Sequence, residues 1–220
     1  MSLPRVVLIG FNKCATRSFA RLFEAAGHKV LHNKLRRPLR ASVNVARLMM
    51  ENETAGLKIL SGIEDFTFYC DLVHVTDDTY YEGGMAFREI FADYPDTIFV
   101  LNLRDREDWI ASRLNHGHGE FAERTQRALN LNSREAVADH WRKLWDRHVA
   151  DVRAFARENP GNVIEFNIDR DEIAAFCASL PAYRLDPANW GDTGRSRGRK
   201  RNPVGKALAS WWSRVRPRSN

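Results

Sequence analysis

The stretch VVLIGFNKCATRSF, residues 6–19, decides the fold class of this chain. Its first four residues form a short apolar run with β-branched side chains, which is typical of a buried strand. Gly10 ends that run, and apolar residues at helical spacing then continue as far as Gly27. We therefore expect a strand, a loop and a helix, in that order.

Later runs repeat the alternation of strand and helix. Residues 97–103 form a near-continuous apolar run, as a buried parallel strand does, and residues 163–166 predict another strand. Residues 134–158 carry an apolar stripe at helical spacing, with Ser133 placed to cap the helix. The alternation predicts an α/β fold in three layers, with helices flanking a mainly parallel central sheet. Ligands of such folds usually bind at the carboxyl ends of the strands.

The middle of the chain gives weaker patterns. Residues 57–63 and 72–75 fit more than one kind of element. Residues 80–84 predict a turn before a helix over residues 86–92.

Length and composition allow one substantial hydrophobic core. The chain has 220 residues, of which 44% are hydrophobic, and it is too short for two ordinary domains. We expect a single α/β domain over residues 1–190 and a basic C-terminal segment over residues 191–220.

The net charge of +6 belongs to this C-terminal segment. It contains nine of the 34 Lys and Arg residues but one of the 28 acidic residues, which leaves 25 basic and 27 acidic residues elsewhere. A nearly neutral body argues against a nucleic-acid partner and favours a local anionic partner near the C-terminus.

The three cysteines do not indicate a disulfide framework or a zinc site. Cys14, Cys70 and Cys177 are odd in number, lack CxxC spacing and have no histidine at metal-ligand intervals, so we expect free thiols. The first predicted strand leaves no room for a signal peptide, and no apolar run approaches the roughly 18 residues of a membrane span. We expect a soluble cytoplasmic protein.

The turn between the first strand and helix favours an anion. A helix start presents unpaired backbone N–H groups and the positive end of the helix dipole. Lys13 adds a positive charge, while Thr16 and Ser18 add hydroxyl donors. A nucleoside-triphosphatase loop would need Gly and Lys at positions 15 and 16, where this chain has Ala15 and Thr16, so an ATPase or GTPase is disfavoured.

With its lysine at position 13, the segment GFNKCATRSF resembles the 5'-phosphosulfate loop PKTGTTSL of sulfotransferases that use 3'-phosphoadenosine-5'-phosphosulfate, PAPS. Lys13, Thr16 and Ser18 match that loop. Four residues depart from it, namely Asn12, Cys14, Ala15 and Arg17.

A second motif follows the later strand. The segment LRDREDWIAS, residues 103–112, is similar to the same family's 3'-phosphate motif RDPxxxxxS. Arg104 and Asp105 match, Arg106 replaces the proline, and Ser112 has the expected spacing. The family's arginine and serine bind the 3'-phosphate, which suits a planar guanidinium and a hydroxyl donor.

The resemblance covers about residues 6–167 and implies a P-loop-type fold and a PAPS-dependent sulfotransferase. Such an enzyme moves a sulfonate group from PAPS in line to a hydroxyl or amine acceptor, releases 3'-phosphoadenosine-5'-phosphate (PAP) and needs no metal. The acceptor would be a small molecule or a lipid. The donor would contact Asn12, Lys13, Cys14, Ala15, Thr16, Arg17, Ser18, Arg104 and Ser112, with Lys13 also catalytic.

The general base is sought in the middle of the chain. Small bacterial sulfotransferase-like proteins carry an FxDL-type segment there, and this chain has FYCDL, residues 68–72. The resemblance implies that Asp71 is the catalytic acid-base residue, although an exposed turn or a helix cap would also explain it. The other candidates are Asp65, Glu64, His32, His116 and His118.

The C-terminal segment has the composition of the family's lid over the 3'-phosphate. In GRSRGRKR, residues 194–201, the expected lid residues are Arg195, Arg197 and Arg199. The alternative is a solvated or membrane-contacting tail, since Trp211 and Trp212 lie near further arginines.

Two rival functions stay open beside the sulfotransferase. One is a P-loop nucleotide kinase-like enzyme, and the other is a non-catalytic nucleotide-binding protein that has kept the fold. Arg17 and Arg106, at positions that are small or Pro in the family, make the second rival conceivable.

Overall fold

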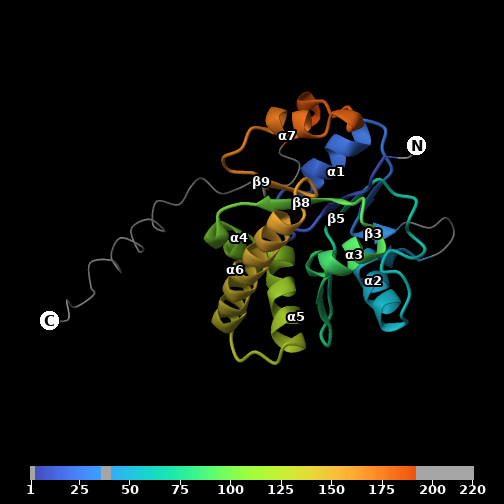
Figure 1. Ribbon diagram of the computed structural model, residues 1–220. Helices are drawn as coiled ribbons and strands as arrows, with labels where there is room; N and C mark the ends of the chain where they lie inside the picture. The colour runs from blue at the N-terminus through green and yellow to red at the C-terminus, as the bar shows by residue number, and fades with distance from the viewer. Residues whose placement is uncertain (1–2, 36–40, 192–220) are drawn as a thin grey trace.

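The computed structural model describes residues 3–35 and 41–191. A parallel sheet of five strands forms its centre, in the order β2-β5-β1-β8-β9 (Figure 1). Its strands are β1 (Val6–Leu8), β2 (Val30–His32), β5 (Phe68–Cys70), β8 (Ile98–Leu103) and β9 (Val163–Asn167). The seven α-helices described are α1 (Thr16–Ala25), α2 (Val45–Thr54), α3 (Phe87–Asp93), α4 (Arg106–Leu114), α5 (Glu120–Ala128), α6 (Arg134–Glu158) and α7 (Ile173–Ser179). This confirms the predicted α/β class.

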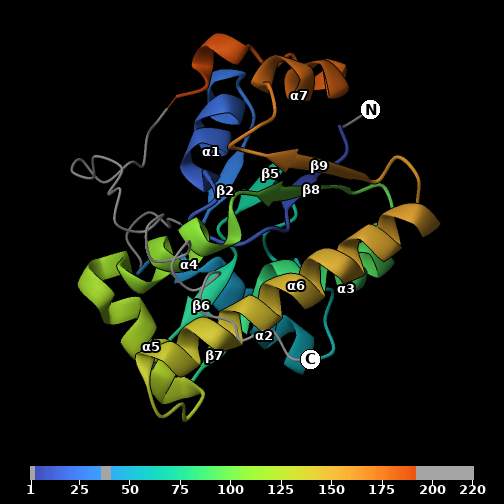
Figure 2. The ribbon, with the colours of Figure 1, turned by 90° about the vertical axis from the view of Figure 1, so that its left-hand side faces the viewer.

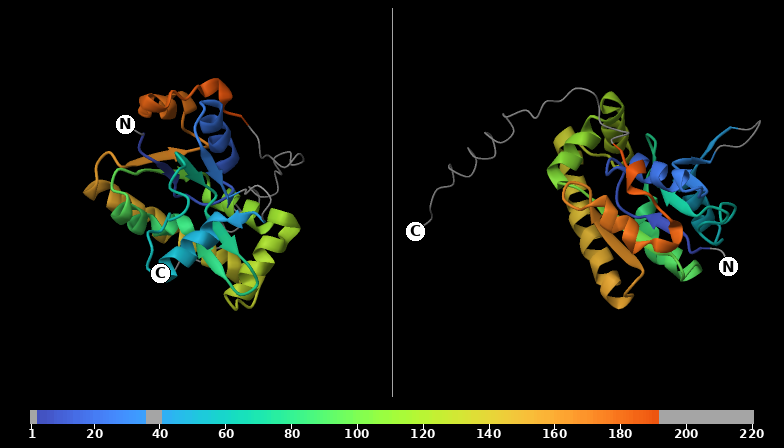
Figure 3. Two further views of the ribbon diagram at one scale, coloured as in Figure 1. Left: turned by 90° about the vertical axis from the view of Figure 1, so that its right-hand side faces the viewer. Right: turned by 90° about the horizontal axis from the view of Figure 1, so that it is seen from above.

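Two separate hydrophobic clusters cover the two faces of the sheet. Along β1, Val6 and Leu8 pack into one cluster while Val7 and Ile9 pack into the other, as the period of two in a strand requires. The first cluster includes buried residues of α1 and α7, which lie together on one side of the sheet (Figures 1 and 3). The second includes residues of α3, α4 and α6 on the opposite side. The fold therefore has three layers, as predicted.

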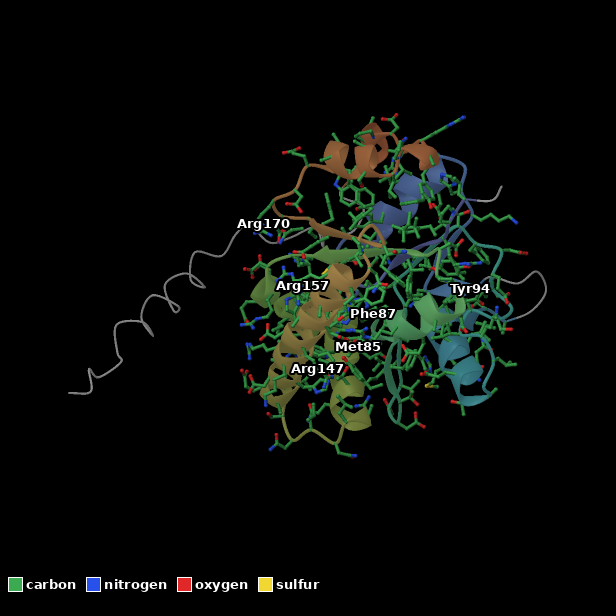
Figure 4. All side chains as sticks on the ribbon, in the orientation of Figure 1. Met85, Phe87, Tyr94, Arg147, Arg157 and Arg170 are labelled. Carbon is green, nitrogen blue, oxygen red and sulfur yellow. The ribbon has the colours of Figure 1, made fainter. Side chains whose placement is uncertain are left out.

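Aromatic side chains fill the layer between α3, α6 and the sheet. Phe87 of α3, labelled in Figure 4, lies with its ring centre 5.2 Å from that of Phe155 of α6 and 6.1 Å from that of Phe99 of β8. All three are essentially buried. This packing fixes α6 across the sheet.

The predicted long helix has the expected ends. Helix α6 spans Arg134–Glu158, and the Ser133 hydroxyl accepts a hydrogen bond of 3.0 Å from the backbone N–H of Ala136. The strand predicted over residues 97–103 is β8, and that over 163–166 is β9.

One local prediction was wrong. Residues 80–84 were expected to form a turn, but Tyr80–Glu82 is strand β7, which pairs antiparallel with β6 (Val73–Val75). A second short hairpin joins β3 (Lys34–Leu35) to β4 (Val43–Asn44). Such two- and three-residue strands are defined by their pairing partner, which a local sequence pattern does not contain.

Single 3₁₀ turns complete the described part, at Gly83–Ala86, His116–Gly119, Pro181–Tyr183 and Pro187–Asn189. All three cysteines are free thiols, and all three are buried. Among the described residues, no helix is long and apolar enough to cross a membrane.

Candidate active site

The loop after β1 lies at the carboxyl edge of the sheet, between the ends of β5 and β8. Figure 2 shows α1 and α4 on either side of the sheet end to which β8 points. Lys13 and Ala15 have left-handed backbones, with φ of 70° and 59°, and Ala15 precedes α1 without a side-chain cap. The first N–H groups of α1 therefore face this edge without a capping side chain, which suits an anionic ligand.

Asn102 of β8 supports the loop from beneath and was not anticipated from the sequence. Its fully buried amide accepts a hydrogen bond of 3.0 Å from the Gly10 N–H and donates one of 2.8 Å to the Cys14 carbonyl. A Cβ on Gly10 would lie 2.3 Å from the Asn102 carbonyl oxygen, so this position requires glycine. An asparagine inside an otherwise apolar strand is the signal that could have identified it.

Two of the residues expected to contact PAPS have buried side chains. The Asn12 side chain is buried and accepts a hydrogen bond of 2.6 Å from Arg113 Nε, while Trp109 Nε1 donates to the Asn12 carbonyl at 3.0 Å. The Cys14 thiol is also buried, and burial raises its pKa to about 12. In this loop conformation the side chains of Asn12 and Cys14 are therefore not accessible to PAPS.

Lys13 lies among charged side chains of the loop, of α1 and of two strand ends. It is partly buried, and burial lowers its pKa, with Arg17 and Arg104 acting in the same direction and Asp71 in the opposite one. These four residues come from the loop, α1 and the ends of β8 and β5, so the fold brings separate sequence motifs together.

Asp71 lies directly after β5 and faces the loop from the neighbouring strand. Its Oδ2 is 3.8 Å from His32 Nε2, and that nitrogen is 3.4 Å from the Thr16 hydroxyl. The Asp71 side chain is 18% exposed, and its backbone is left-handed, with φ of 58°. Burial raises the pKa of the carboxyl, while nearby His32 and His116 lower it. A carboxylate in this environment is suited to accept a proton.

The remaining base candidates lie differently. Asp65 and Glu64 are exposed and precede β5, at the opposite end of the strand from Asp71, and Glu64 accepts a hydrogen bond of 2.7 Å from the Gly62 N–H. His116 lowers the pKa of Asp71 electrostatically. The pKa of His116 itself is lowered, first by partial burial and then by the charge of Lys13. His118 is exposed, with φ of 58°. Asp71 therefore lies near His32 and interacts electrostatically with His116, whereas Asp65 lies at the other end of β5.

The second motif forms the other flank of the loop. Arg104 Nη1 donates to the Lys13 carbonyl at 3.1 Å, and its buried Nε has no partner among the described residues. Ser112 is partly buried on α4. A hollow beside Arg104 is lined by Leu103, Trp145, Asp146, Val149, Ala150, Arg153, Asn167 and Arg170, of which Arg170 is labelled in Figure 4. The half-buried Arg104 therefore brings a positive charge to this flank of the loop.

The last described residue lies against the loop helix. The Ser18 hydroxyl donates to the Gly191 carbonyl at 2.6 Å, and the ring centre of Trp190 is 4.8 Å from that of Phe19. The expected lid residues Arg195, Arg197 and Arg199, with Trp211 and Trp212, lie outside the described residues. Residues 3–35 and 41–191 contain no group of three or more His, Cys, Asp or Glu side chains that could hold a metal ion.

Comparison with known proteins gives two findings. The family model described as "Sulfotransferase domain" matches residues 5–167. The crystal structure of a sulfotransferase from Alicyclobacillus acidocaldarius is similar to this chain with a TM-score of 0.50 and 16% identity, covering 97% of this chain and 93% of that one. At this identity the likeness concerns the fold. None of the curated proteins matches the chain.

Proposed function

The chain belongs to the sulfotransferase domain family, and on this premise we propose that it moves a sulfonate group from PAPS to a hydroxyl or amine acceptor. The bond between the 5'-phosphate oxygen and sulfur breaks, and a bond between sulfur and the acceptor oxygen or nitrogen forms. The acceptor proton passes to a base, and PAP is released.

One arrangement supports this function most strongly. Lys13 and the start of α1 lie at the end of β1, and Asp71 lies at the end of the adjacent strand β5. Asp71 is close enough to Lys13 to act on its ammonium group electrostatically and to raise its pKa. A cationic loop suited to a leaving phosphate therefore lies beside a partly desolvated carboxylate suited to an acceptor.

The loop side would stabilise the charge that develops on the leaving phosphate. Lys13 and the first N–H groups of α1 act most strongly in the transition state, because negative charge accumulates there as the sulfonate departs. Arg104 and Ser112, both half-buried, would meet the 3'-phosphate on the other flank of the loop. This assignment accounts for the donor without a metal ion.

The strand side would activate the acceptor. Asp71 takes the proton from the acceptor hydroxyl or amine, and His32 at 3.8 Å orients the carboxylate and tunes its basicity. Because the Asp71 carboxyl is largely removed from water, its raised pKa brings it closer to the range of an effective base.

A transfer assay tests the function directly. The protein is incubated with isotopically labelled PAPS and a bacterial metabolite extract, and mass spectrometry identifies products that gain the labelled sulfonate. We expect such products with the wild type and not with Lys13→Ala. Magnesium-dependent turnover of ATP without sulfonated products would contradict the proposal and favour a nucleotide kinase-like enzyme. PAP binding without any product in diverse extracts would favour a non-catalytic binding protein.

A further inference from the structure

Arg113 of α4 is fully buried, although arginine side chains usually lie at the surface. Aromatic rings surround its guanidinium: the Cζ atom is 4.8 Å from the ring centre of Trp141, 4.9 Å from those of Trp109 and Phe121, and 5.6 Å from that of Phe11. Cation–π contacts replace part of the lost hydration. A charge in such surroundings still requires hydrogen-bonding partners in defined directions.

Most of this charge is neutralised inside the protein. Arg113 Nη2 donates to Oε1 of the buried Glu82, and the Tyr80 hydroxyl donates to the same oxygen at 2.7 Å. Arg113 therefore presents no open charge to a ligand, although it directly follows Ser112. Its role is different from that of the phosphate-binding residues.

Another nitrogen of the guanidinium, Nε, bonds to the loop after β1. Arg113 Nε donates to Asn12 Oδ1 at 2.6 Å, and Trp109, also on α4, donates to the Asn12 carbonyl at 3.0 Å. Asn12 immediately precedes Lys13, whose left-handed backbone is unfavourable for a residue other than glycine. Such conformations persist where the surrounding structure determines them, and α4 supplies this support.

We propose that Arg113 is a positioning residue for the donor: acting through Asn12, it sets the loop conformation that presents Lys13 and the first N–H groups of α1. The same contact links the 5'-phosphosulfate loop to the helix that carries Ser112, so the two donor motifs move as one unit. This inference rests on the proposed PAPS site.

A double-mutant cycle on PAP affinity tests the role. Arg113→Lys keeps the charge beside Glu82, but its single nitrogen cannot serve Glu82 and Asn12 together. Asn12→Ala removes the acceptor. Each single variant loses the hydrogen bond between the charged Arg113 side chain and Asn12. We therefore expect each to bind PAP about 10-fold more weakly in calorimetry. The double variant should be no weaker than the weaker single variant, because both changes break the same contact.

A second measurement needs no ligand. Hydrogen exchange of the backbone amides of residues 13–18 should be faster in Arg113→Lys than in the wild type, while exchange in β8 and α6 stays unchanged. The matched control is Arg142→Lys on α6, where a partly exposed arginine bonds to Glu107. This control should change neither PAP affinity nor loop exchange.

The outcomes distinguish the positioning role of Arg113 from the proposed PAPS site. Wild-type PAP affinity in Arg113→Lys, or losses that multiply in the double variant, would overturn the positioning role. Unchanged loop exchange in Arg113→Lys would overturn it as well. Failure of the wild type to bind PAP would reject the proposed donor, and the exchange measurement would then decide the role of Arg113 by itself.

Discussion

Asp71→Asn separates the proposed chemistry from donor binding. The substitution keeps the shape of the side chain and removes its ability to accept a proton. Asp71 follows β5, 3.8 Å from His32, whereas Arg104 follows β8 on the other side of β1. We therefore expect PAP affinity to stay close to that of the wild type. We expect turnover to fall by about 10²-fold or more, the usual scale for loss of a general base.

The same variant should also be more stable at neutral pH. Burial raises the pKa of the Asp71 carboxyl in the folded protein, so the folded state binds this proton more tightly than the unfolded chain does. Stability is therefore lost as pH rises through the range between the unfolded and folded pKa values. Asparagine carries no charge and avoids this loss. Each kcal/mol regained corresponds to about 2–4 °C in the melting temperature of a chain of this size.

Three assays decide the Asp71 prediction: PAP calorimetry, single-turnover transfer from labelled PAPS, and thermal melting at neutral and acid pH. The advantage of Asp71→Asn in melting temperature should shrink at acid pH, where the wild-type carboxyl is protonated. Asp65→Asn is the matched control, since the same change is made at an exposed aspartate at the other end of β5. Normal turnover in Asp71→Asn, or loss of turnover in Asp65→Asn alone, would refute the assignment.

Three further predictions concern the loop and its neighbours. Lys13→Ala should reduce turnover more than donor affinity, because the charge is most effective in the transition state; equal losses in kinetics and calorimetry would contradict this. His32→Gln should move the acid limb of the pH–rate profile to higher pH, because His32 lowers the pKa of Asp71; a limb that moves to lower pH would contradict this. Gly10→Ala should destabilise the fold by about 1–3 kcal/mol in denaturant unfolding, because its Cβ would meet Asn102; wild-type stability would show that the loop can shift.

The sequence predicted the parts of the fold that depend on local pattern. Helix α6 carries its own apolar stripe and its own cap at Ser133, and β8 is a near-continuous apolar run. Both were therefore found with nearly correct ends. Strand β5 is only three residues long, Phe68–Cys70, and it is recognisable as a strand through its pairing with β1 and β2.

The sequence could suggest a site residue from a local motif. It could not show which residues distant in the sequence lie beside it. Lys13 was expected from its charge and its place after a predicted strand, and Arg104 from the resemblance of its segment to the family's 3'-phosphate motif. The choice of Asp71 over Asp65 depends on which end of β5 each one occupies, and that strand was not assigned. Arg113 would be expected at the surface, since the sequence does not show that β7 places Glu82 beside it.

The most direct test of a PAPS site compares PAP with AMP in calorimetric titrations of the wild type and Arg104→Ala. PAP has a 3'-phosphate that AMP lacks, and we place that phosphate beside the half-buried Arg104 guanidinium. A charge-assisted contact of this kind predicts that the wild type binds PAP at least about 10-fold more tightly than AMP. Arg104→Ala should lose most of that preference, while Arg142→Ala, at the partly exposed arginine of α6 that pairs with Glu107, should keep it. Equal affinity of the wild type for PAP and AMP would contradict the account.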